Sequence, residues 1–151
     1  ETGLPVWIGT SCTLLPNGNV SAWDSLMEEP ENRLSRNHVS SVENISYNNL
    51  IEAMLLFEPQ VMGLMHSTVE TTNAGLNTLF DYWQGPVMAY PETSSQVRKG
   101  VSQEIEPSVF ARHCHDWVNK GVQIIGGCCG TTIEHIRALV YELGDVISDR
   151  H

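Results

Sequence analysis

The sequence predicts a parallel α/β fold of four consecutive strand–helix units, equivalent to the C-terminal half of a (β/α)8 barrel. Four apolar runs are nearly continuous in hydrophobicity, a pattern typical of parallel strands buried on both faces. A segment with helical spacing follows each run, and such alternation implies right-handed crossovers within one sheet. The length of 151 residues, with 41% hydrophobic and 17% charged residues, indicates one globular domain spanning residues 1–151.

The expected elements alternate along the chain. The strands are predicted at Pro5–Thr10, Gln60–Met65, Pro86–Tyr90 and Val122–Ile125. The apolar stripes of the helices are Leu50, Ile51, Met54 and Leu55; Leu76, Leu79, Phe80 and Trp83; Phe110, Cys114, Trp117 and Val118; and Ile136, Leu139, Val140 and Leu143. Pro107 suits the first turn of the third helix, and Thr131 with Glu134 has the spacing of a capping box for the fourth.

Two features of this arrangement remain open at the level of sequence. A sheet of four parallel strands has two unpaired edges, so we expect a second copy, a missing N-terminal half-barrel, or an open sheet. The polar segment from Leu14 to Glu43 follows the first strand and contains the turn signal Pro16-Asn17-Gly18. It is either a lid over the active face or a disordered insertion.

Charge and cysteine content restrict the partners and the compartment. The formal net charge is −10, which disfavours nucleic acid and anionic membranes as partners. No apolar run approaches the roughly 20 residues that span a bilayer. The four cysteines do not resemble a secreted disulfide framework, so we predict a reducing, cytoplasmic location.

The strongest chemical signal is the run Gly126-Gly127-Cys128-Cys129-Gly130 between the last strand and the last helix. Parallel α/β folds place their active sites at this end of the sheet. Cysteine thiolates are zinc ligands, with Zn–S bonds of about 2.3 Å. His66 ends the second strand and is the natural third ligand. Three protein ligands leave one tetrahedral position open, as in catalytic zinc sites.

Simpler interpretations compete with the metal site. Adjacent cysteines in a glycine-rich turn also occur as packing residues, and a single histidine at a strand end is often an ordinary hydrogen-bonded residue. Cys12 is expected to face the same end of the sheet and ranks below the other three candidates. Cys114 is predicted to be a core residue, with His113 and His115 facing solvent.

The segment from Val122 to Ile136 resembles the closing signature of the homocysteine S-methyltransferase family, which usually reads GGCCGTTPEHI; Ile133 stands in place of the proline. Weaker similarities are found in Glu1–Ile8 with the family's fifth strand, in Ala89-Tyr90-Pro91 with its YPN motif, and in Glu106–Phe110 with its next helix start. The resemblance covers the whole chain but only the C-terminal half of the family's domain.

This resemblance implies zinc-dependent transfer of a methyl group to the homocysteine thiol, forming methionine. The implied donors are cationic: S-adenosylmethionine, S-methylmethionine or a betaine. Cys128 and Cys129 match two of the family's three cysteine ligands, while His66 replaces the third. The net charge of zinc with its protein ligands would then be 0 instead of −1. Glu92 stands at the asparagine of the YPN motif and, with Thr131 and Thr132 at the start of the last helix, is expected to bind substrate.

Two other functions remain compatible with the sequence. The chain is alternatively a truncated or degenerate homologue that folds, binds zinc and does not turn over, as the change at His66 and the missing half suggest. In a third interpretation, a different thiol or a water takes the open zinc position. The sequence does not identify the methyl donor or the oligomeric state.

Overall fold

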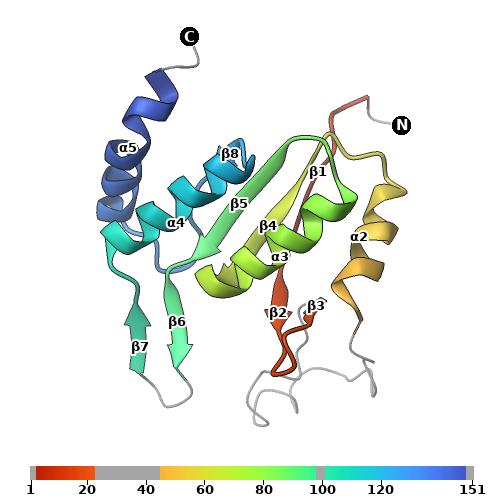
Figure 1. Ribbon diagram of the computed structural model, residues 1–151, viewed down its shortest axis with the longest axis horizontal. Helices are drawn as coiled ribbons and strands as arrows, with labels where there is room; N and C mark the ends of the chain where they lie inside the picture. The colour runs from red at the N-terminus through yellow and green to blue at the C-terminus, as the bar shows by residue number, and fades with distance from the viewer. Residues whose placement is uncertain (1–2, 23–44, 98–100, 149–151) are drawn as a thin grey trace.

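A computed structural model of the chain describes residues 3–22, 45–97 and 101–148. Its central sheet is parallel and has the strand order β1-β4-β5-β8 (Figure 1). The strands are β1 (Trp7–Thr10), β4 (Val61–Thr68), β5 (Val87–Glu92) and β8 (Ile124–Ile125). Helices alternate with these strands, namely α2 (Tyr47–Leu55), α3 (Val69–Tyr82), α4 (Pro107–Lys120) and α5 (Ile133–Ser148). The predicted parallel α/β fold with alternating strands and helices is therefore confirmed.

The register explains why glycines occur within the strands. Gly63 of β4 lies opposite Gly9 of β1 on one side and Met88 of β5 on the other. A Cβ atom at Gly63 would collide with the backbone carbonyl of Met88. The strands therefore approach closely because this position has no side chain.

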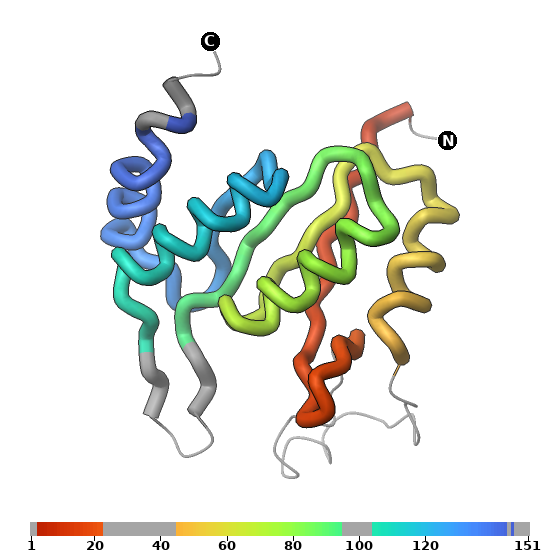
Figure 2. Tube along the Cα trace, viewed as in Figure 1, coloured from red at the N-terminus to blue at the C-terminus, as the bar shows by residue number. Residues whose placement is uncertain are grey.

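The helices bury their apolar stripes against the sheet and against one another. In Figure 2 the strands run side by side, with α3 in front of β4 and β5. Helix α2 packs beside α3, and α4 packs against α5. Each of the first three predicted stripes contributes fully buried side chains. Among all the described residues, the largest fully buried side chains are Trp117, Tyr47, Phe110, Ile51, Met62, Leu64, Leu76 and Leu79.

Two antiparallel hairpins extend from the carboxyl-terminal side of the sheet (Figure 1). The first pairs β2 (Cys12–Leu14) with β3 (Val20–Ala22) around the predicted Pro16-Asn17-Gly18 turn. The second pairs β6 (Ser94–Val97) with β7 (Val101–Glu104). The start of the predicted lid or insertion is thus an ordered hairpin, whereas residues 23–44 of that segment lie outside the described residues.

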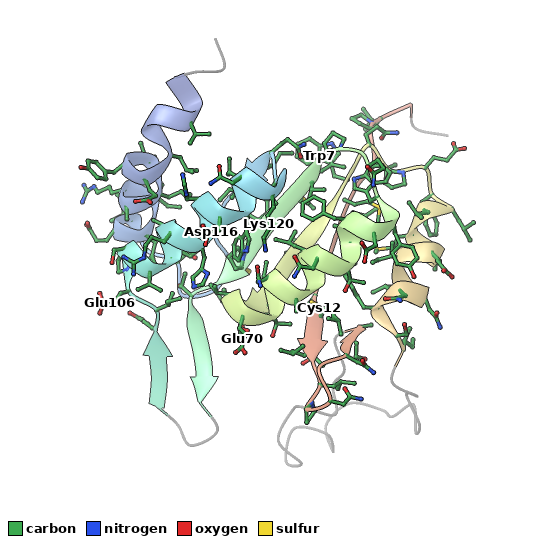
Figure 3. All side chains as sticks on the ribbon, viewed as in Figure 1. Trp7, Cys12, Glu70, Glu106, Asp116 and Lys120 are labelled. Carbon is green, nitrogen blue, oxygen red and sulfur yellow. The ribbon has the colours of Figure 1, made fainter. Side chains whose placement is uncertain are left out.

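The outer strands of the sheet have distinct surroundings. Strand β1 pairs with β4, and β8 pairs with β5, so each has one sheet partner among the described residues. Apolar side chains next to the β1 edge are exposed: Leu4 is 72% exposed and Trp7, labelled in Figure 3, is 56% exposed. Among the helices that the structure describes, none is long and apolar enough to cross a membrane.

Candidate metal centre

His66 owes its position to an irregularity in β4. The pairing of β4 with β5 shifts register between Met65 and Thr68. Within that interval His66 has a positive φ of 51°, in the left-handed region that non-glycine residues seldom adopt. The bulge interrupts the alternation of the strand at its carboxyl end. The imidazole consequently lies at the end of the sheet, with 53% of its side chain exposed.

The Cys128–Cys129 turn is fixed by backbone hydrogen bonds. The Cys128 amide donates to the Pro91 carbonyl at 2.9 Å, and the Cys128 carbonyl accepts from the Thr131 amide at 3.2 Å. The Cys129 carbonyl accepts from the Thr93 amide at 2.9 Å. Gly130, at φ 78°, allows the chain to turn directly into the last helix. Both thiols are therefore held over the end of β5.

The three predicted ligands lie together. Nδ1 of His66 is 3.8 Å from Sγ of Cys128 and 3.5 Å from Sγ of Cys129, and the two sulfurs are 3.8 Å apart. These atoms form a group that could hold a metal ion. The structure therefore brings together side chains that are more than 60 residues apart in the sequence.

These separations fit a tetrahedral zinc ion. With Zn–S bonds of about 2.3 Å and Zn–N bonds of about 2.05 Å, tetrahedral angles require S–S separations of about 3.8 Å and S–N separations of about 3.6 Å. The observed values lie within about 0.2 Å of both, the tolerance expected of a plausible metal site. Two sulfurs and an imidazole nitrogen are also a donor set that zinc favours.

Glu92 is adjacent to this group. Its Oε2 atom lies 3.9 Å from Nδ1 of His66, and its side chain is 16% exposed. Burial raises the pKa of Glu92, while the neighbouring His66 acts in the opposite direction. The hydrogen bond with Cys128, the repulsion that a thiolate at Cys128 would exert, and the nearby Glu92 carboxylate raise the pKa of the Cys129 thiol. Without a metal, Cys129 therefore retains its proton more firmly than an ordinary cysteine.

The start of α5 differs from the predicted capping box. The helix begins at Ile133, and the ring of His135 rather than the Glu134 carboxylate accepts a hydrogen bond from the Thr132 amide, at 3.2 Å. Thr131 instead packs over Gly127, and its Oγ1 atom is buried with no hydrogen-bond partner among the described residues. The cap thus forms one residue later than predicted, with Thr132 at the helix start.

The remaining cysteines and histidines lie elsewhere. Cys12 does not face the metal group: it is buried against α3 (Figure 3), and its Sγ donates to the Thr71 carbonyl at 3.7 Å. Burial raises the pKa of Cys12 to about 12, and Cys114 is a fully buried core residue as predicted. His113 and His115 are half-buried rather than solvent-facing, and the His113 ring contacts Trp117.

The fold and this group define a class of protein: a parallel α/β domain with a thiol–imidazole centre at the carboxyl end of its sheet. The homocysteine S-methyltransferase family profile matches residues 2–143. The chain therefore belongs to the homocysteine S-methyltransferase family, as the resemblance in the sequence predicts.

A solved structure has a similar fold. It is the crystal structure of the homocysteine methyltransferase MmuM from Escherichia coli in its oxidized form, with 24% sequence identity and a TM-score of 0.51. The similarity covers 65% of this chain and 30% of the MmuM chain. At this identity the likeness shows the shared α/β fold alone, and the chain spans less than a third of the protein it matches.

Proposed function

We propose that this chain is the zinc-binding, C-terminal half of a homocysteine methyltransferase (β/α)8 barrel, with His66, Cys128 and Cys129 as the metal ligands. The observation that supports this most directly is the separation of the three ligand atoms, 3.5–3.8 Å, which suits a tetrahedral ion. A bound zinc ion would lower the pKa of an incoming thiol and orient it for attack.

The three side chains leave room for the substrate thiol. A tetrahedral ion held by three protein ligands has one further position, which is typical of catalytic centres. The exposure of His66 and Cys129 supports an approach from solvent. In the proposed reaction the homocysteine thiol releases its proton to solvent and a new S–CH3 bond forms on its sulfur, while the bond from that methyl group to the donor breaks and the donor leaves with one positive charge fewer.

The neighbouring residues suit the other groups of the substrate. The amides of the first turn of α5 favour a carboxylate, and Thr131 and Thr132 precede that turn. The Glu92 carboxylate is placed beside His66 to pair with the substrate ammonium group. We therefore assign Glu92 to the ammonium group of homocysteine and the helix start that follows Thr131 and Thr132 to its carboxylate; the polar side-chain atoms of the two threonines hold that helix start in place, since Thr131 Oγ1 is buried and Thr132 Oγ1 bonds His135.

The charge near the site favours a cationic methyl donor. Glu92 lines a cleft of about 410 Å³ together with three other glutamates, Glu70, Glu104 and Glu106. Carboxylates concentrate cations and disfavour anions in such a cleft. A sulfonium or quaternary ammonium donor, namely S-adenosylmethionine, S-methylmethionine or a betaine, fits this environment. Free thiols also require a reducing compartment such as the cytoplasm.

A complete barrel requires further parallel strands. We propose that β1 and β8 each pair with a strand of an N-terminal half-barrel or of a second copy of this chain. The exposed apolar side chains next to β1 support such a contact. In this proposal residues 1–151 form a single structural unit that completes its substrate pocket only with the other half.

The second candidate function is metal binding without turnover. It is favoured by His66, which replaces the thiolate that the family's pattern has at this position. With zinc, two thiolates and one imidazole give a net charge of 0 instead of −1, so a substrate thiolate there is a weaker nucleophile. The chain would then be a folded homologue that retains the metal site after losing activity.

Two measurements test these functions. Metal analysis of the purified chain should give one zinc per chain, and Cys128→Ser should abolish it. Cys114→Ala is the matched control, because that thiol is buried in the core and should leave zinc content unchanged. Zinc-free wild-type protein after growth with zinc would refute the metal centre. Methyl transfer from several donors to homocysteine then separates the enzyme from the inactive homologue.

A further inference from the structure

The Cys128–Cys129 turn belongs to a closed ring of hydrogen bonds. Starting at the turn, the Cys129 carbonyl accepts from the Thr93 amide, and the Thr93 carbonyl accepts from the Ile105 amide, each at 2.9 Å. The Ile105 carbonyl lies 2.8 Å from Nε2 of His135. The other ring nitrogen of His135 contacts Thr132, from which three peptide bonds lead back to Cys129.

His135 joins the two halves of this ring. Because Nδ1 accepts from the Thr132 amide at 3.2 Å and from the Thr132 hydroxyl at 2.8 Å, the ring proton belongs on Nε2. Nε2 therefore donates to the Ile105 carbonyl. One imidazole thus uses its acceptor at the start of α5 and its donor at the segment between β7 and α4.

The ring of His135 has little freedom to move. His135 and Thr93 are each only 2% exposed. The His135 ring also packs edge-to-face against the Phe110 ring, with 5.6 Å between the ring centroids and 85° between the ring planes. Unlike a solvent-exposed cap, such a buried group has no water to replace a lost partner. Displacement of the imidazole would therefore release the Ile105 carbonyl and, through Thr93, loosen the turn that holds both sulfurs.

We infer that His135 is a positioning residue for the metal centre, which holds the Cys128–Cys129 turn in place through Ile105 and Thr93 without touching the metal or substrate. Its connection to Cys129 through this arm consists of hydrogen bonds between fixed backbone groups. The arm through Thr132 instead passes Gly130, whose backbone is the most adaptable in the turn. The Ile105 arm is therefore the one that controls the sulfurs.

The full chain with single substitutions at His135 tests this assignment. His135→Phe removes both hydrogen bonds, His135→Asn retains an acceptor near Nδ1 for Thr132, and His135→Gln retains a donor near Nε2 for Ile105. His113→Phe is the matched control, because His113 also contacts an aromatic ring on α4 but has no hydrogen bond to the turn within the described part of the chain.

Three readouts separate positioning from general stability. Amide hydrogen exchange of Thr93 and Ile105, and the rate at which a trivalent arsenical bridges the two thiols, report on the turn without metal. Zinc affinity, measured by competition with a chelator, reports on the assembled site. We expect His135→Phe and His135→Asn to speed both metal-free readouts, amide exchange and arsenical bridging, about tenfold. We also expect these two substitutions to weaken zinc binding about tenfold, which is the lower end of the loss seen when a residue that supports a metal ligand is changed. His135→Gln should stay within about threefold of wild type.

If His135→Phe showed the same rates of arsenical bridging and amide exchange as the wild type, the inference would be overturned. Equal losses in the Phe and Gln variants, in proportion to thermal stability, would also overturn it, because they would reduce His135 to a core residue. The zinc readout rests on the proposed function, whereas exchange and arsenical bridging do not. A wild-type chain that binds no zinc but shows the expected pattern in those two readouts would refute the proposed function and support the positioning role.

Discussion

In the proposed metal centre, the pH dependence of zinc binding follows from the protonation of the two thiols, and Cys129→Ser is the substitution that tests it. A cysteine ordinarily carries its proton at neutral pH and must lose it to bind zinc. The pKa of Cys129 is raised by its contacts with Cys128 and Glu92, so this thiol keeps its proton to a higher pH than an ordinary cysteine does. Zinc binding to the wild-type chain should therefore release two thiol protons.

The magnitude is set by the number of protons. Each proton displaced changes the binding constant about tenfold per pH unit while the thiol remains protonated in the free protein. Between pH 7 and pH 8 zinc affinity should rise about 100-fold in the wild type and about tenfold in Cys129→Ser. The sign is fixed: since the metal-free thiols bind more protons than the metal-bound thiolates, affinity increases with pH.

Competition with a chromophoric chelator at several pH values measures the slope, and calorimetry in buffers of different ionisation enthalpy counts the protons directly. Cys12→Ala is the control, because Cys12 is buried away from the metal group and should leave the slope unchanged. A wild-type slope of one proton or fewer, or a Cys129→Ser slope equal to that of the wild type, would refute the assignment of two thiolate ligands.

Three further predictions concern the ligand set and the core. In His66→Cys, the sulfur-to-metal charge-transfer absorption of the cobalt(II)-substituted chain should rise about 1.5-fold, the ratio of three thiolates to two; an unchanged spectrum would exclude position 66 as a ligand. Gly63→Ala should destabilise the fold by about 3 kcal/mol, because its Cβ meets a backbone carbonyl, whereas Gly144→Ala, whose Cβ meets nothing within 4 Å, should stabilise it by about 0.5 kcal/mol. Leu76 is fully buried, so Leu76→Ala should lower the free energy of unfolding by about 3 kcal/mol; Leu56 is 82% exposed, so Leu56→Ala should lower it by less than about 0.5 kcal/mol. Urea denaturation measures both pairs, and equal effects within a pair would contradict the packing described.

Most of the central sheet could be predicted because its signal is strong. The runs that became β1, β4 and β5 are apolar on both faces, and each is followed by a stripe at helical spacing. The hairpin of β6 and β7 was not predicted, since its strands are short and their sequences, SSQV and VSQE, are largely polar. Pro16-Asn17-Gly18 did signal the turn of the other hairpin, but the flanking strands have three residues each.

The sequence predicted that the three candidate ligands would converge, but it did not predict the residues that support them. His66 lies near the carboxyl end of β4, and Cys128 and Cys129 follow β8; the carboxyl ends of parallel strands meet at one side of a sheet, so the convergence of these residues could be foreseen. The contributions of Thr93 and His135 could not, because both depend on backbone partners in distant segments. Cys12 was placed wrongly, since the chain turns into β2 directly after β1 and carries that thiol under α3.

The left-handed backbone at His66 has a consequence for how this position can change. Holding a non-glycine residue there costs about 1 kcal/mol, which the surrounding strand pairing must offset. In return, the direction of the Cα–Cβ bond is set by the chain and not by the identity of the side chain. Histidine and cysteine can therefore occupy this position with the same main-chain geometry, and in the proposed metal centre such an exchange would change the electron density on the ion without a change in the backbone around it.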